Sequence, residues 1–198
     1  DSYAVYVEFS DLSYVGELSG GGHTFPIVAD VCYNYATEGT AELCIKEDLT
    51  DTTDDHVCKV SGQRNIETSG GPVQVTKLEE FPSGKNAVTF TFTVKDMGNG
   101  ILSKKDTVCS ELVADENKVW IEVDTGMEGA LDCSGLTDGD DSSGYIKLAG
   151  GERTVRCKQT ITDSEKSDYL KVMSIKLDYD YLESKETHIR VVHNELDD

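Results

Sequence analysis

Positive charge is scarce in this chain of 198 residues: 18 lysines and arginines stand against 38 aspartates and glutamates, and the net charge is −20. Nucleic-acid binding needs a basic surface that faces the phosphates, and adhesion to anionic lipid needs clustered lysine and arginine. Both classes of partner are therefore excluded. The acidic balance suits an outer surface in a saline or cation-rich medium.

Long hydrophobic runs are also missing. No stretch approaches the roughly 18 apolar residues of a membrane-spanning helix, so we expect no membrane insertion of the mature chain. No signal peptide is recognisable, and the sequence begins at Asp1 without a methionine. We interpret it as a mature product after processing.

Catalytic motifs are absent as well. The chain has no Gly-x-Ser-x-Gly elbow, no His-Glu-x-x-His pair and no Gly-rich phosphate loop, and it has only four histidines. Carboxylates are so numerous that their proximity in sequence carries no information. We therefore expect a protein that is not an enzyme, and a secreted hydrolase is the weakest of three hypotheses about function.

What the chain has is period-2 alternation, which is typical of half-buried β-strands. In the segment 88–94, Val88, Phe90, Phe92 and Val94 share one face and threonines line the other. Similar alternation marks the segments 27–35, 119–123 and 173–181, and shorter apolar pairs mark 57–60, 73–75, 146–148, 155–161 and 189–191. With only three prolines to break these runs, we predict an all-β protein of β-sandwich architecture.

A hairpin is predicted early in the chain. The segment Thr37-Glu38-Gly39-Thr40 reads as a turn, after which Ala41, Leu43 and Ile45 return on the same apolar face. In that register Cys32 would lie opposite Cys44, and a bridge between them is sterically possible.

An N-terminal strand arm precedes this region. Tyr3, Val5, Val7 and Phe9 fall on one face of an alternating segment, and Ser19-Gly20-Gly21-Gly22 separates it from the rest. An apolar strand face does not stay in water. The arm must dock either on its own sandwich, as a first strand, or on a neighbouring copy.

Six dispersed cysteines predict a disulfide framework and an extracellular or cell-surface location. They are Cys32, Cys44, Cys58, Cys109, Cys133 and Cys157, and none lies near a histidine at zinc-ligand spacing.

No cofactor is expected, with calcium as the one candidate ion. Asp138, Asp140 and Asp141 lie in a glycine-containing loop with Ser142, and Asp48, Asp51, Asp54 and Asp55 form a second acidic loop. Hard cations prefer such oxygen ligands. The alternative is that both loops are simply solvated.

The segment 88–100, an alternating strand that runs into an Asn-Gly turn, resembles immunoglobulin-like modules of archaeal surface proteins. Cysteine-bearing strands around Cys44, Cys58, Cys133 and Cys157 are also similar to theirs. The resemblance implies an extracellular module with structural or adhesive duties. It implies a Cys44–Cys58 bridge, which leaves Cys32 for a distant partner such as Cys109. We favour Cys44–Cys58 and Cys133–Cys157, although the sequence alone does not decide the pairing.

We predict an arm and linker over 1–22, followed by immunoglobulin-like β-sandwich domains over 23–104 and 105–198, or by one large sandwich over 23–198. The leading hypothesis is a structural subunit of an extracellular filament or surface layer. In it, Tyr3, Val5, Val7 and Phe9 of one copy would complete the sheet of the next copy, so that the partner is the protein itself. The alternative is a monomeric adhesive or ligand-binding module of a cell-surface protein.

Overall fold

The computed structural model describes residues 6, 8–10, 12–16, 21–51 and 57–192. The chain divides into two compact units. The core unit comprises Val31–Glu183, and the terminal unit combines Asp1–Asp30 with Ser184–Asp198.

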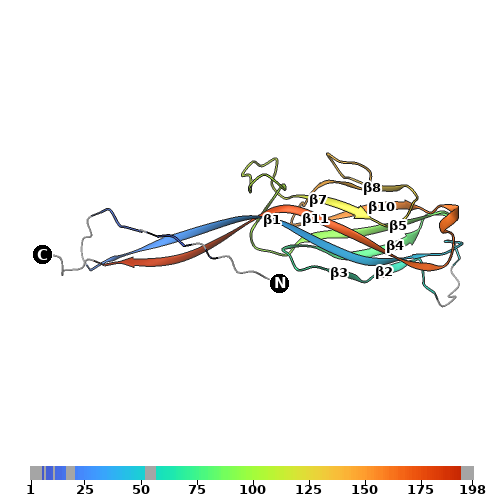
Figure 1. Cartoon of the computed structure of the whole chain (residues 1–198), viewed down its shortest axis with the longest axis horizontal. Helices are drawn as coiled ribbons and strands as arrows, with labels where there is room; N and C mark the ends of the chain where they lie inside the picture. Colours follow the sequence, from blue (N-terminus) through green and yellow to red (C-terminus); the bar gives the residue numbers. More distant parts are fainter. Residues whose placement is uncertain (1–5, 7, 11, 17–20, 52–56, 193–198) are drawn as a thin grey trace. The chain divides into compact units, whose positions relative to one another are not determined.

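Two antiparallel β-sheets make up the fold (Figure 1), so the prediction of an all-β, sandwich-like architecture is confirmed. The first sheet has the order β3-β1-β11-β7-β9, with β6 paired to β11, and the second has the order β2-β4-β5-β10-β8. The strands are β1 (His23–Ile45), β2 (Gly62–Arg64), β3 (Ile66–Thr68), β4 (Val73–Pro82), β5 (Ala87–Asp96), β6 (Ile101–Ser103), β7 (Lys118–Asp124), β8 (Leu131–Ser134), β9 (Ser143–Lys147), β10 (Glu152–Thr160) and β11 (Tyr169–Val191). A short 3-10 helix, η1, spans Asp163–Glu165.

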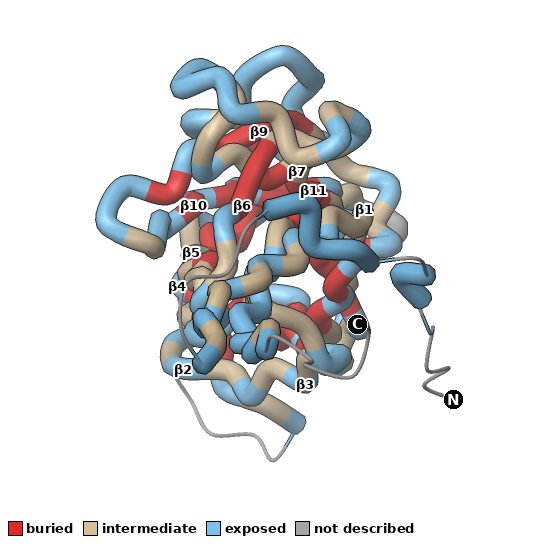
Figure 2. Tube along the Cα trace, turned by 90° about the vertical axis from the view of Figure 1, so that its left-hand side faces the viewer, coloured by how far each residue is buried: buried red, intermediate tan, exposed pale blue. Residues whose placement is uncertain are grey.

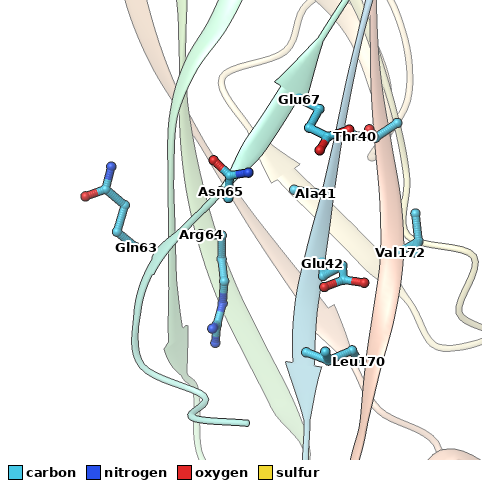
Figure 3. Close-up of a pocket in the computed structure, with 9 residues that line it drawn as sticks. All are labelled: Thr40, Ala41, Glu42, Gln63, Arg64, Asn65, Glu67, Leu170 and Val172. Atoms are coloured by element: carbon cyan, nitrogen blue, oxygen red, sulfur yellow. The ribbon is translucent and has the colours of Figure 1, made fainter.

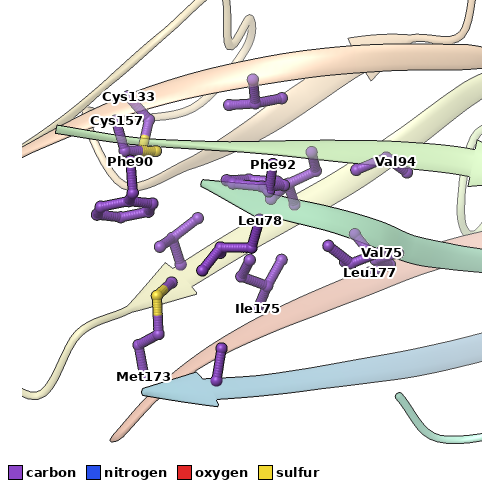
Figure 4. Close-up of a cluster of buried hydrophobic side chains, with 14 of the residues drawn as sticks. Val75, Leu78, Phe90, Phe92, Val94, Cys133, Cys157, Met173, Ile175 and Leu177 are labelled. Carbon is purple, nitrogen blue, oxygen red and sulfur yellow. A yellow bond between two sulfur atoms is a disulfide. The ribbon is translucent and has the colours of Figure 1, made fainter. Parts of the chain in front are cut away.

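The hydrophobic core lies between the two sheets of the core unit (Figure 4). Alternate residues of β5, including Phe90 and Phe92, face Ile175 and Leu177 of β11, and all four are almost fully buried. Figure 2 shows buried residues gathered along these strands, while the connecting loops are exposed. The alternation in 88–94 and 173–181 therefore correctly identified the buried faces of β5 and β11, because successive side chains of a strand point to opposite faces.

The predicted hairpin at Thr37–Thr40 is wrong. β1 continues through this segment as one strand of 23 residues, and Gly39 to Ala41 pair with β3. Tyr35, Thr37, Gly39 and Ala41 are all odd-numbered, so the side-chain alternation keeps its phase across the supposed turn. A turn-like composition was outweighed here by pairing on both sides of the strand.

Four tyrosines pack together where β1 and β11 run side by side. Tyr35 stacks on Tyr179 with ring centroids 5.9 Å apart, and Tyr33 lies 6.1 Å from Tyr181. The Tyr179 hydroxyl lies 2.9 Å from the hydroxyl of Thr37 and accepts the backbone N–H of Val73 at 3.1 Å. Burial raises the pKa of Tyr179 to about 12, so the phenol stays protonated. Tyr179 and Tyr181 thus belong to the hydrophobic core, and Tyr33 and Tyr35 are partly buried against it.

Other predicted elements differ from the structure. Residues 57–60 do not form a strand, and the predicted strand at 189–191 is the end of β11. The boundary expected at residues 104 and 105 does not separate two sheet systems. β5 pairs with β10 and β6 pairs with β11, so strands from 23–104 and from 105–198 share both sheets. Residues 31–183 form one compact unit.

Three disulfides are present: Cys32–Cys109, Cys44–Cys58 and Cys133–Cys157. These pairs agree with the pairing that the resemblance implied, and the Cys32–Cys44 bridge of the hairpin register does not form. Cys133 and Cys157 are direct cross-strand neighbours on β8 and β10. Three disulfides fit a secreted or extracellular protein.

In the terminal unit, the first part of β1 and the last part of β11 form a two-stranded ladder (Figure 1). The Ser184 hydroxyl donates a hydrogen bond to the Asp30 carboxylate at 2.5 Å, and the ring of Tyr14 lies 5.3 Å from that of Phe25. None of the described residues of this unit is buried. A two-stranded ladder without a buried face is only marginally stable in water.

Candidate functional site

The N-terminal segment is the first candidate. Its predicted interface residues Tyr3, Val5 and Val7 lie outside the described residues. At the described positions, Tyr6 and Glu8–Ser10 form no strand, and Tyr6 and Phe9 have exposed fractions of 93% and 68%. At these positions the segment therefore contributes no first strand to its own sheets.

A groove of about 480 Å³ lies beside β1 in the core unit (Figure 3). Thr40, Ala41 and Glu42 of β1 line one side of it, and Gln63–Asn65 with Glu67 line the other. Leu170 and Val172 of β11 add an apolar patch, with exposed fractions of 46% and 60%. The groove exists because the ladder between β3 and β1 ends at Ala41 and Ile66, after which the chain passes through Asn65 to β2 in the other sheet.

A buried carboxylate lies close to this groove. Both oxygens of Glu80 accept the backbone N–H of Cys44, at 3.0 and 3.2 Å, and Arg64 Nε lies 2.6 Å from Glu80 Oε2. The side chain of Glu80 is fully buried, whereas that of Arg64 is 16% exposed. Burial raises the pKa of Glu80 to about 7, against the opposing effects of the Cys44 N–H and Arg64.

Neither Glu80 nor Arg64 was predicted from the sequence as a site residue. A weak signal existed. Glu80 lies two residues after Leu78 and so shares its inward-facing side of β4, where a charged residue is unusual unless it is paired. Arg64 gave no signal, because only the fold brings β2 beside β4.

A loop over residues 104–117 forms the third candidate surface. Val108, Leu112 and Val113 are strongly exposed there, and Asp106, Val108 and Cys109 all have positive φ angles. Such angles are unusual for a β-branched residue and persist only where the surroundings enforce them. The enforcement comes from two sources, the Cys32–Cys109 disulfide and the buried carboxylate of Asp180.

Asp180 accepts the backbone N–H groups of Asp106 at 3.1 Å, Thr107 at 2.8 Å and Cys109 at 3.3 Å. It also accepts the side-chain amide of Asn34 at 3.0 Å. Burial by itself would raise the pKa of Asp180, but these hydrogen bonds outweigh it and the pKa is lowered. The carboxylate therefore stays ionised and holds the loop.

The proposed calcium loop has a local explanation. Asp140 accepts the backbone N–H groups of Ser142 at 2.8 Å and Ser143 at 2.7 Å. Within the described residues, which include Asp138, Asp140 and Asp141, no group of three acidic, histidine or cysteine side chains is placed to hold a metal ion. In the second acidic loop, the Asp48 carboxylate accepts hydrogen bonds from the backbone N–H and the hydroxyl of Thr50. Asp54 and Asp55 lie outside the described residues. The structure therefore lends no support to a calcium site.

The structure thus defines a class of protein with two antiparallel β-sheets and three disulfides. No known protein family, curated protein or solved structure matched this chain. In the part of the chain that the structure describes, no helix has the length and apolar character needed to cross a membrane. The resemblance to archaeal surface modules stays a prediction.

Proposed function

We propose that this protein is a structural subunit of an extracellular assembly, and that residues 3–9 of one copy add as a strand to the sheet of a second copy. The observation that carries the proposal is the exposure of Tyr6 and Phe9 in a segment whose described residues join neither sheet of their own chain. An immunoglobulin-like sandwich and a cell-surface location belong to the same proposal.

The groove at Glu42, just beyond Thr40 and Ala41, is the acceptor in this proposal. β3 pairs with β1 only over Gly39–Ala41, so among the described residues no strand lies beside this edge of β1 from Glu42 onward. Strand addition satisfies the backbone hydrogen bonds of a free segment and of an open edge together. Leu170 and Val172, on the strand at the other side of β1, line the same groove and would add apolar surface for side chains that reach across β1.

Burial of the apolar face of the arm would supply the driving force for this contact. Burying four side chains of the type of Tyr3, Val5, Val7 and Phe9 is worth on the order of 6–12 kcal/mol before the cost of ordering the arm. The contact joins two different surfaces, so it is heterologous. A rotation that does not close on itself then produces an open polymer.

Electron microscopy of the full-length protein under non-reducing conditions, beside a variant lacking residues 1–18, tests the proposal. Filaments from the full chain alone support it. Discrete monomers from both proteins overturn it and favour a monomeric adhesive or ligand-binding module.

The acceptor is tested separately by the double substitution Leu170→Glu and Val172→Glu, which places charge in the groove. We expect it to abolish filaments while the protein remains folded. The matched control is Leu112→Glu with Val113→Glu, two residues that are similarly exposed but lie outside the groove. Filaments that survive the groove variant and disappear in the control would place the acceptor elsewhere.

The second candidate function is an adhesive or ligand-binding module. The loop over 104–117 favours it, because Val108, Leu112 and Val113 are exposed on a segment that a disulfide and Asp180 hold in place. Exposed apolar side chains on a fixed loop are typical of recognition surfaces. Binding of the monomer to glycan or peptide arrays, lost in the Leu112→Glu and Val113→Glu variant, would support this candidate.

A further inference from the structure

The last part of β11 has an open edge in the terminal unit. β6 pairs with β11 only over Asp180–Leu182, and β7 pairs with it only over Ser174–Asp178. From Ser184 to Val191, β1 is the one strand beside β11 among the described residues. An edge of this length is a template for pairing with another strand.

The outward-facing backbone groups of this edge can be assigned by alternation. A Cβ atom on Gly22, the residue before β1, would come within 2.7 Å of the carbonyl oxygen of Val191, so the backbone groups of Val191 face β1. Backbone groups of successive residues point to opposite sides of a strand. Those of Ser184, Glu186, His188 and Arg190 therefore face outward, and each of these residues has an N–H to donate.

The other edge of the ladder is blunted. Pro26 lies in the middle of the β1 portion, between His23 and Asp30, and it has no N–H. Proline within a strand is confined to positions where the missing donor faces the open side. Pro26 therefore removes a donor from the free edge of β1, whereas the edge of β11 retains all of its donors.

The sequence along the open edge is complementary to itself. In an antiparallel pair of two copies centred on His188, Glu186 lies opposite Arg190 of the partner subunit, and the same contact occurs twice. Opposite charges on directly facing residues stabilise a strand pair. Both side chains are exposed, and in the single chain Glu186 Oε1 lies 3.4 Å from His188 Nε2. The described residues of β1 and β11 in this unit carry two acidic and two basic side chains, Asp30, Glu186, Lys185 and Arg190. Because these four charges balance, two copies of the ladder do not repel each other as other surfaces of a chain with a net charge of −20 would.

We propose that Ser184–Val191 of β11 pairs antiparallel with the same segment of a second copy, on a two-fold axis at His188, and forms a continuous four-stranded sheet. This contact is isologous and closed. It uses no residue of the N-terminal arm or of the groove, so it is independent of the proposed function. If both hold, the repeating unit of the assembly is a dimer.

Disulfide trapping in the full-length protein tests the pairing and its register. All six native cysteines are in disulfides, so an added cysteine is the one free thiol. In the proposed register residue 188 faces itself across a hydrogen-bonded pair with a Cα–Cα distance of about 5.5 Å, which lies within the range for a disulfide. We expect His188→Cys to form a covalent dimer on mild oxidation at micromolar protein, seen on a non-reducing gel.

Thr187→Cys is the matched control, because Thr187 would lie opposite Ile189 of the partner subunit. Little dimer is expected from it. A dimer that forms more readily with Thr187→Cys than with His188→Cys overturns the register. Equal, slow crosslinking of both variants shows that only random collisions occur and overturns the pairing.

Charge exchange provides a second, independent measurement. In the His188→Cys background, Glu186→Arg places two arginines opposite one another at both contacts, and we expect the rate of covalent dimer formation to fall about tenfold. Combining Glu186→Arg with Arg190→Glu restores both contacts and should restore the rate. Failure of the double exchange to rescue the single one overturns the proposal. Loss of filaments on removal of residues 1–18, with the trapped dimer retained, would show that the two contacts are separate.

Discussion

The Glu80 carboxylate accepts the backbone N–H of Cys44 at 3.0 and 3.2 Å and so joins the second sheet to the first from within the interior. Cys44 lies on β1 beyond the last residue paired with β3, where its N–H would otherwise be an open donor at a sheet edge. Glu80 thus satisfies the Cys44 N–H with a side chain in place of a strand, so an added strand would pair with β1 before Cys44.

The raised pKa of Glu80 makes the stability of the protein depend on pH. Between its ordinary value of 4.5 and about 7, the folded state binds more protons at this group than the unfolded state does. The contribution of Glu80 is therefore fully present below about pH 4.5 and is lost as the pH rises through about 7, a change of up to about 3 kcal/mol. Chemical denaturation at pH 4.5, 6 and 8 measures it.

Glu80→Gln keeps an acceptor for the Cys44 N–H and removes the titration. We expect its free energy of unfolding to vary less between pH 4.5 and 8 than that of the wild type. Glu79→Gln, at the neighbouring and partly exposed position on β4, is the control and should follow the wild type. Parallel pH profiles for wild type and Glu80→Gln would contradict the assignment.

Gly98 packs against a buried tyrosine. A Cβ atom at this position would clash with the hydroxyl of Tyr181 and come within 2.9 Å of Pro72. We expect Gly98→Ala to lower the free energy of unfolding by about 1–3 kcal/mol through overpacking. Gly70→Ala, where a Cβ atom would meet nothing within 4 Å, should be nearly neutral. Thermal and urea unfolding of both variants compare them, and equal stability of the two would be inconsistent with this packing.

The Cys32–Cys109 disulfide closes the longest loop of the three, with a sequence separation of 77. In the chain-entropy account, replacing both cysteines with alanine costs about 4 kcal/mol, against about 3 kcal/mol for the pair Cys44 and Cys58 with its separation of 14. We also expect limited proteolysis to cut within 104–117 in the first variant alone. Resistance of that loop would show that Asp180 suffices to hold it.

Asp180→Asn replaces one acceptor oxygen with an amide group that faces backbone donors. We expect a loss of about 3 kcal/mol, since buried donors are left without an acceptor. Because the pKa of Asp180 is lowered in the fold, its contribution is present above the ordinary carboxyl pKa and is lost as the pH falls through the lowered value. The variant should therefore lose less stability on acidification than the wild type.

Asp178→Asn is the control for this variant. Asp178 lies 3.1 Å from Lys176 and 3.8 Å from Lys105, in ion pairs that are partly exposed, and such pairs contribute about 1 kcal/mol or less. Urea unfolding of both variants at pH 7 separates the two cases. Equal losses would mean that the hydrogen bonds of Asp180 to the loop carry no special weight.

Much of the fold could be predicted where local pattern and tertiary environment agree. The alternation in 88–94 identified β5 and its buried face, and that in 173–181 identified the central part of β11, because both strands pack one face on the core. The short strands β2, β3, β6 and β8 gave no such pattern, since three or four residues are too few for a period to show. The prediction of a strand at 57–60 was wrong because four residues are likewise too few to show a reliable period.

By itself, the sequence determined the β class and the buried faces of β5 and of the central part of β11, and its six cysteines predicted a disulfide framework. These properties follow from the side-chain period and from composition, which are local. Only the tertiary structure decided that β1 runs straight through Thr37–Thr40, that Cys32 reaches Cys109, and that Glu80 meets Cys44 and Asp180 meets the loop. Each of these depends on which distant segments lie side by side, and many different pairings of strands satisfy the same alternation.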